Sequence, residues 1–212
     1  MVKPRLRGVS HRYAFFASIA FAIALITSAA TGLPRFGATV YGVTLVGMFG
    51  ASALYHGPKW PPHRARRFLQ LDHTAIFLFI AGTTTPMVLL TNHGRVRVLV
   101  LGLAWAIALG GIIYEWLPVR PPRGYVTTVY LVIGWVGLLA IGGLWDSTGI
   151  AGVALVAAGG ALYTVGAIVH AARRPDPWPQ VFGYHEVFHL LVIGAAVLHY
   201  CAIAFYVLPL GE

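Results

Sequence analysis

The chain has 212 residues, of which 58% are hydrophobic and only 10% charged, and its mean hydropathy is +0.76. A soluble domain carries about 25% charged residues, and a chain this short cannot bury so much apolar surface in one soluble core. The composition therefore excludes a soluble protein and predicts one embedded in lipid. The formal charge of +9 does not indicate nucleic-acid binding, because the arginines form short clusters between long apolar runs, as they do in cytoplasmic loops.

Seven apolar stretches are long enough to cross a bilayer as helices, which takes about 20 residues each. In chain order they are 13–31, 38–56, 70–90, 97–117, 125–145, 150–171 and 182–208. Glycines, prolines and charged residues fill the gaps between these stretches and indicate turns, as in Asp146 to Gly149. No internal repeat or second domain is visible. We therefore expect residues 1–212 to form one all-α domain with seven transmembrane helices.

The lysines and arginines predict the orientation of these helices. Of the 15, 12 lie in segments on the side of the N-terminus, and the remaining ones on the opposite side are Arg35, Arg95 and Arg97. Loops rich in Lys and Arg stay in the cytoplasm. We therefore expect a cytoplasmic N-terminus and, with seven crossings, a C-terminus outside.

Several polar side chains occur where apolar ones are expected. An ionisable side chain inside a membrane costs about 2.5–3.5 kcal/mol, so each one indicates a function. The second, third and seventh stretches bring such groups to one depth, near their cytoplasmic ends: Ser52 and His56, Asp72, and His185 with His189. Within each pair the residues are four apart, which places them on one helix face about 6 Å apart along the axis.

The three histidines are of the type and number that bind catalytic zinc. Such a zinc ion takes three protein ligands and leaves a fourth position for water, and imidazole nitrogen suits it well. We therefore predict His56, His185 and His189 as ligands of a Zn²⁺ ion. A single histidine of this kind more often forms a hydrogen bond to a neighbouring helix, but three at one depth favour the metal. The only cysteine, Cys201, excludes a cysteine cage.

Asp72 and Ser52 are the predicted catalytic residues. A lone carboxylate at the start of a span needs a cation, a hydrogen-bond donor or a proton. Beside zinc, Asp72 would hold and deprotonate the attacking water. The structural alternative is a salt bridge with Arg66 or Arg67. Ser52 would donate to the water or to a developing oxyanion, or else to a carbonyl of its own helix.

The segment from His185 to His189 also matches the H-E-x-x-H pattern of zinc proteases, in which the glutamate is the general base. Here that residue is Glu186, which at the edge of the membrane could equally be solvated or paired with Arg173 or Arg174. A protease would leave the matching depth of the other polar groups unexplained, so this hypothesis ranks third.

The remaining histidines are not expected to bind the metal. His199 lies ten residues beyond His189, about 15 Å deeper along the helix, and is interpreted as a packing residue. The other five fall at interfaces or in loops where the sequence implies no partner: His11, His63, His73, His93 and His170.

Three motifs give the chain a resemblance to a known family. They are Ser52-x-x-x-His56, the segment 71–77 (LDHTAIF) followed by 81–86 (AGTTTP), and the segment 182–189 (FGYHEVFH). With these motifs the chain resembles the hemolysin III proteins, which are bacterial relatives of the progestin and adipoQ receptors and of the alkaline ceramidases. The resemblance covers most of the chain, includes the seven-span plan, and implies a multi-pass protein of the bacterial inner membrane.

The resemblance also implies roles for the site residues. His56, His185 and His189 would be zinc ligands, Asp72 would hold the water, and Ser52 would support it. The better-known relatives hydrolyse the amide of ceramides, so the resemblance implies a zinc-dependent amide hydrolase. It does not give the substrate of this chain, and no residue here accounts for a lytic activity.

Two classes of function follow from these observations. The first is a zinc-dependent hydrolase that cleaves an amide of a lipid-like substrate, whose acyl chain lies among the apolar helices. The second is a non-catalytic receptor or sensor in which zinc joins the second, third and seventh spans. Both place the protein in the lipid bilayer without nucleic acid, and the sequence does not give its oligomeric state.

Overall fold

The computed structural model describes residues 3–57, 59–119, 122 and 124–211. In this part of the chain the secondary structure is helical and no strand is formed, as the all-α prediction requires. The elements are α1 (Val9–Ser28), α2 (Leu33–His56), α3 (Pro62–Thr91), α4 (Gly94–Trp116), α5 (Tyr125–Trp135), η1 (Val136–Ala140), α6 (Ile141–Ala172), α7 (Tyr184–Ala202), η2 (Ile203–Val207) and η3 (Leu208–Gly211).

The outer surface of these helices is apolar, as a lipid-facing surface must be. Large side chains such as Val98, Phe16 and Phe205 are more than half exposed on the helices. Six helical stretches of the described chain are long and apolar enough to cross a membrane. The protein is therefore a multi-pass integral membrane protein.

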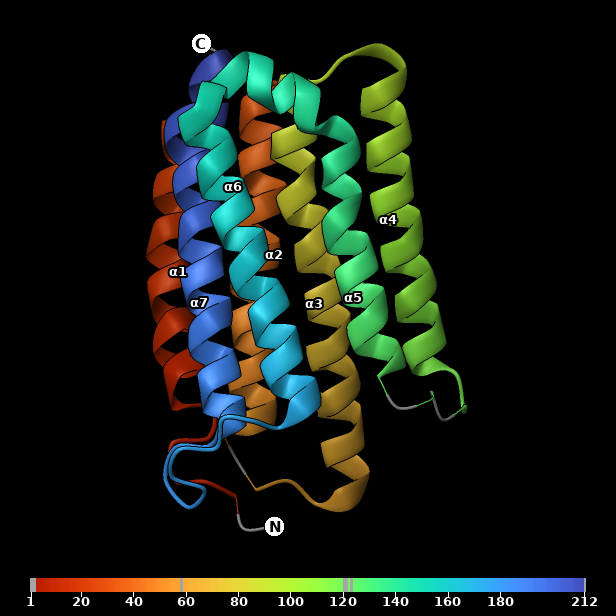
Figure 1. Ribbon diagram of the computed structural model, residues 1–212, viewed down its shortest axis with the longest axis vertical. Helices are drawn as coiled ribbons and strands as arrows, with labels where there is room; N and C mark the ends of the chain where they lie inside the picture. Colours follow the sequence, from red (N-terminus) through yellow and green to blue (C-terminus); the bar gives the residue numbers. More distant parts are fainter. Residues whose placement is uncertain (1–2, 58, 120–121, 123, 212) are drawn as a thin grey trace.

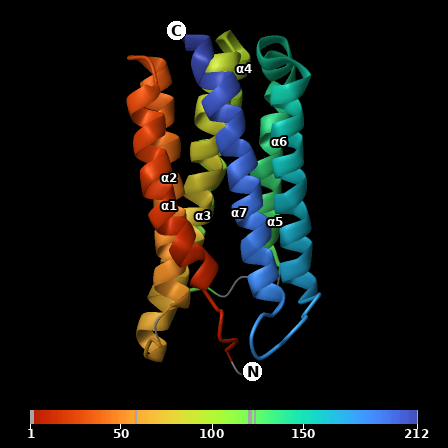
Figure 2. The same ribbon diagram turned by 90° about the vertical axis from the view of Figure 1, so that its left-hand side faces the viewer.

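The helices run side by side and the two chain termini lie at opposite ends of the bundle (Figures 1 and 2). The chain packs α2 against α1 and α3, and α6 against α7. The most enclosed helix is α3, of whose most apolar 18 residues 72% are buried. We call the end of the bundle at which α1 and α7 begin and α2 ends the N-terminal end.

One of the six apolar stretches, Tyr125–Ala172, has 48 residues. A straight helix of that size would be about 72 Å long, far more than the roughly 30 Å hydrocarbon core of a bilayer. The stretch turns at Gly149, whose φ of 63° and ψ of −166° are readily adopted only by glycine. In Figure 1, α5 and the long part of α6 are separate rods, joined by short helical pieces at the end of the bundle. The predicted turn at Asp146 to Gly149 is thus made by its last residue.

Four helices, α1 to α4, begin earlier than the apolar runs suggest. The apolar run of the third span starts at residue 70, but α3 begins at Pro62, because proline suits the first turn of a helix. The run of the first span starts at residue 13, but α1 begins at Val9. The earlier start matters for the site, because it places His11 inside a helix.

Candidate metal centre

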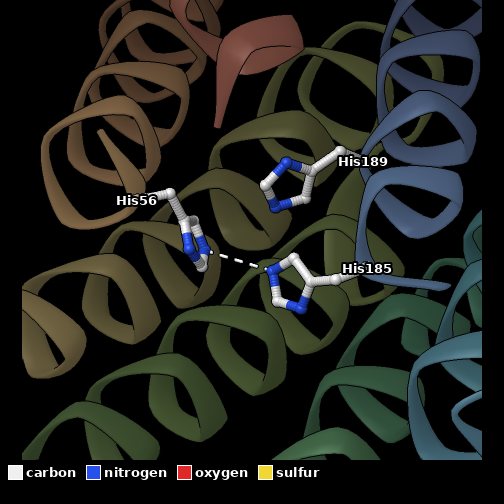
Figure 3. A group of neighbouring side chains, drawn as sticks. All are labelled: His56, His185 and His189. Carbon is white, nitrogen blue, oxygen red and sulfur yellow. Dashed lines mark hydrogen bonds between the residues drawn. The ribbon is translucent and has the colours of Figure 1, made fainter. Parts of the chain in front are cut away.

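Three histidines converge at the N-terminal end of the bundle. His56 is the last residue of α2, and His185 and His189 occupy the first two turns of α7. Their rings point toward one another from the two helices (Figure 3). One ring nitrogen from each lies within 4.8 Å of the other two, so the three can hold one metal ion.

The spacing of two of these nitrogens fits zinc. Nε2 of His56 and Nε2 of His185 are 3.2 Å apart. Two zinc–nitrogen bonds of 2.0–2.1 Å at a tetrahedral angle would separate their nitrogens by about 3.3 Å. In addition, the buried Nδ1 of His189 has no hydrogen-bond partner among the described residues. Three convergent imidazoles are a donor set that suits zinc.

Asp72 lies directly beside this cluster. It lies in the first half of α3, is 7% exposed, and places Oδ2 3.8 Å from Nε2 of His56. Its other oxygen, Oδ1, is buried and accepts no hydrogen bond from the described residues. Among the residues that the structure describes, Asp72 forms no salt bridge with Arg66 or Arg67, which was the structural alternative. The carboxylate therefore has a free acceptor atom next to the histidines.

His11 is a buried neighbour of the cluster that the sequence does not reveal. The sequence implies no partner for it, but it is only 2% exposed, and its ring stacks on that of His189 with centroids 3.7 Å apart. Its Nε2 donates to the carbonyl oxygen of His189 at 3.4 Å. A neutral imidazole that donates at Nε2 accepts at Nδ1. His11 is thus held against one of the predicted ligands from both its ring face and its edge.

Ser52 is joined to the cluster through His11. Its hydroxyl is 2.8 Å from Nδ1 of His11. The hydroxyl can therefore donate either to this nitrogen or to the carboxyl group of Asp72, with which it also interacts. Ser52 thus lies between His11 and Asp72, and its predicted role as a donor to the water or to an oxyanion stays a prediction.

Glu186 is neither solvated nor paired with Arg173 or Arg174. It is 2% exposed, and Arg7 donates to its Oε1. The other oxygen, Oε2, accepts from the backbone N–H of Gly183 at 2.8 Å and so caps α7. Both oxygens are thus engaged in fixing the start of α7, which leaves the protease hypothesis without a general base.

The segment before α1 packs next to the cluster and pairs with the loop that leads into α7. Its backbone N–H groups at Arg5 and Leu6 donate to the carbonyl oxygens of Gln180 and Val181, each at 3.0 Å. Gly8 has a φ of 79°, and a Cβ there would lie 2.6 Å from Cβ of His56. Only glycine combines this backbone angle with so close an approach. The N-terminal segment therefore packs against a predicted metal ligand.

A cavity of about 1190 Å³ leads from this cluster toward the other end of the bundle. Its lining includes Asp72 and Thr91, which are 19 residues apart on α3 and hence about 28 Å apart along the helix axis. Threonine hydroxyls along the wall, such as those of Thr83, Thr84 and Thr164, donate to carbonyls of their own helices. The lining that remains is mainly apolar, and its length is about the thickness of the hydrocarbon core of a bilayer.

Several other histidines also have partners that the sequence does not imply. His73 lies 3.1 Å from a carboxylate oxygen of Glu115, and the ring of His170 lies 5.2 Å from that of His185. His93 is bonded to Arg97 at 2.9 Å. His199 is 9% exposed and donates to the carbonyl of Val156 at 3.1 Å, in agreement with its interpretation as a packing residue.

The chain matches a family model described as haemolysin-III related over residues 1–200. It belongs to this family. As the three sequence motifs predicted, the haemolysin III-related match includes all the residues of the histidine cluster. The match establishes the relationship, and its description names neither a metal nor a reaction.

Curated relatives include proteins of bacteria and of a plant. The chain is 37% identical to Hemolysin-3 of Bacillus cereus over 171 residues, which cover 81% of this chain and 75% of that protein. It is 32% identical to the Hemolysin-3 homolog of Bacillus subtilis (strain 168), with 79% and 76% of the two chains covered. It is 30% identical to the heptahelical transmembrane protein ADIPOR2 of Oryza sativa subsp. japonica, with 81% and 82% covered. The relatives thus include a heptahelical transmembrane protein of a plant as well as bacterial proteins named hemolysin.

Proposed function

We propose that this protein is a zinc-dependent hydrolase of the bacterial inner membrane that cleaves an amide bond in a lipid-like substrate. The observation that carries the proposal is a buried carboxylate with a free oxygen, Asp72, beside three convergent imidazoles at the head of a long apolar cavity. A metal, a proton acceptor and a place for an acyl chain are what such a reaction needs.

The proposal includes seven crossings with a cytoplasmic N-terminus. The turn at Gly149 lets the 48-residue stretch cross twice, and the termini lie at opposite ends of the bundle, as an odd number of crossings requires (Figure 1). One relative is named heptahelical. The excess of Lys and Arg on the side of the N-terminus supports the orientation.

Each residue of the site has a task in this reaction. When bound, zinc polarises a carbonyl and lowers the pKa of water enough for attack near neutral pH. His56, His185 and His189 hold the ion through neutral nitrogens. Asp72 accepts a proton from the attacking water at Oδ1 and returns it to the leaving amine nitrogen, since a carboxylate can serve as base and then as acid. His11, stacked on His189 and held by Ser52, fixes the orientation of that ligand.

The cavity defines the rest of the substrate. Its mainly apolar wall suits an acyl chain, because the cavity runs parallel to the helices over about the thickness of the hydrocarbon core. Its volume of about 1190 Å³ exceeds the roughly 300–1000 Å³ of common ligand sites. A long-chain amide placed there has its carbonyl at the histidines.

The test replaces Asp72 by asparagine in the purified, zinc-loaded protein. Loss of a general base lowers rates by about 10²–10⁴-fold. We therefore expect hydrolysis of a panel of long-chain acyl amides, followed by mass spectrometry, to fall by that factor while the zinc content stays unchanged. Asp146→Asn, which changes an acid on α6 at the opposite end of the bundle, is the matched control. Unchanged turnover in Asp72→Asn with zinc bound would falsify the mechanism.

The second candidate is a non-catalytic protein in which zinc ties α2 to α7. It is favoured by the 3.8 Å between Asp72 and His56, a distance from which the carboxylate can become a fourth ligand and close the coordination shell. In that case Asp72→Asn weakens zinc binding and lowers the melting temperature, and wild-type protein hydrolyses none of the amides. The same two measurements thus separate the two candidates.

A further inference from the structure

The N-terminal mouth of the cavity is lined by positive side chains. Five charged residues of the described chain line the cavity, and four of them are cations: Lys3, Arg7, Lys59 and Arg173. The fifth is Asp72, which lies against His56. Because the cations come from three separate segments, the mouth itself concentrates positive charge.

The acids at this end of the bundle are engaged elsewhere. Glu186 binds Arg7, Glu115 lies against His73, and Asp176 accepts from the backbone N–H of Tyr184. None of these carboxylates lines the cavity. In the residues that the structure describes, no carboxylate lies within ion-pair distance of Lys59 or Arg173. Lys59 and Arg173 therefore bring to the mouth a positive charge that no carboxylate of the described residues pairs with.

Lys3 shows that these cations are crowded. Its ammonium donates to the carbonyl of Gly57 at 3.3 Å, which places it next to the end of α2. Burial lowers its pKa, and the nearby charges of Arg7 and Lys59 lower it further. Like charges held this close repel each other, and an anion bound among them removes that repulsion.

We propose that the substrate carries, besides its acyl amide, a carboxylate or phosphate on the amine side, held at the mouth by Lys3, Lys59 and Arg173. This inference rests on the proposed function and specifies its substrate class: N-acylated amino acids, or N-acylated amino alcohols that bear a phosphate. Lys3 is bonded to Gly57, which directly follows His56, so the cations lie next to the histidines. A substrate with its amide carbonyl at the histidines therefore presents its amine side to these cations. The acyl chain extends the other way, into the apolar part of the cavity.

The experiment compares N-oleoylglycine with its neutral analogue N-oleoylglycinamide, which has the same chain and the same amide. Binding to the metal-free protein is measured by displacement of a fluorescent fatty alcohol, and turnover is measured separately on the zinc-loaded protein. We expect about ten-fold tighter binding of the anion at low salt, since each partly exposed charge contact contributes a few-fold. N-oleoylphosphoethanolamine, in a third arm, distinguishes a phosphate from a carboxylate preference.

The decisive variants remove the same number of positive charges from the same end of the bundle, either inside or outside the cavity lining. Lys59→Gln with Arg173→Gln should reduce the preference to about two-fold or less, because only the charge of Lys3 and the paired Arg7 remain. Lys59→Arg with Arg173→Lys should retain it, which shows that the sites still fold. Arg64→Gln with Arg67→Gln removes two charges from the same end of the bundle that do not line the cavity, and should also retain it.

Two outcomes overturn the inference. One is equal binding of the charged and neutral amides by the wild-type protein. The other is an equal loss of preference in the Arg64 and Arg67 variant, which would show that these cations only face anionic membrane lipid. Preferential binding without any turnover would leave the anion site standing and instead contradict the hydrolase.

Discussion

The two ends of α7 each contain a buried histidine, and only one of them belongs to the candidate metal centre. His189, near the start of α7, is 1% exposed, and His199, near its end, is 9% exposed. Both have an Nδ1 without a hydrogen-bond partner among the described residues. They differ in their neighbours, because His189 faces two more imidazoles, whereas His199 faces a backbone carbonyl and the ring of Tyr163. Burial alone therefore does not identify a ligand, and the convergence of a complete donor set does.

The largest expected effect is the loss of zinc when the histidine near the start of α7 is replaced, and not when the one near its end is replaced. His189→Ala removes one of three ligands and should weaken zinc binding by more than about 100-fold, which exceeds the effect of changing a residue behind a ligand. His199→Ala should leave the zinc content unchanged. Elemental analysis of both purified variants checks this, and equal zinc contents would contradict the assignment.

A smaller effect is expected from the residue behind His189. His11→Ala removes the stacked ring and should weaken zinc binding by about 10–100-fold, as changes behind a metal ligand do. His11→Phe keeps a ring to stack but loses both hydrogen bonds, so it should fall between the alanine variant and the wild type. Competition with a zinc chelator measures the affinity. His63→Ala, an exposed histidine at the same end, is the control, and an unchanged affinity in His11→Ala would remove this residue from the site.

The smallest effect concerns the other end of α7, where packing replaces metal binding. A Cβ at Gly159 of α6 would collide with the ring of His199, so Gly159→Ala should destabilise the protein by about 1–3 kcal/mol. Zinc content should not change. Gly142→Ala, in the same helix but with open space around its Cβ, is the matched control. Thermal unfolding in detergent compares the two, and a loss of zinc in Gly159→Ala would show that the two ends are coupled.

The sequence predicts the helical membrane fold and the meeting of distant side chains well. Apolar length gives the spans, and helical spacing gives the depth of a polar residue within a span. These two quantities are sufficient to place His56, Asp72 and His185 at one level of the membrane. The turn at Gly149 is also visible in the sequence as a break in the apolar pattern.

The parts that could not be predicted depend on where helices begin and how they rotate. His11 has no polar neighbour one turn away on its own helix, and the apolar run begins after it, so its burial depends on the earlier start of α1. Glu186 looks exposed in the sequence because it stands at a helix start, yet Arg7, 179 residues away in sequence, covers it. Such a pairing depends on tertiary packing and has no local signal.

The N-terminal segment has a practical consequence for work on this protein. Since residues 4–8 pass below His56 and pair with the segment that leads into α7, any sequence fused ahead of them would emerge at the mouth of the cavity. The C-terminus lies at the opposite end (Figure 2). Affinity tags and fluorescent fusions therefore belong on the C-terminus, and an amino-terminal tag would itself compete with ligands for the mouth.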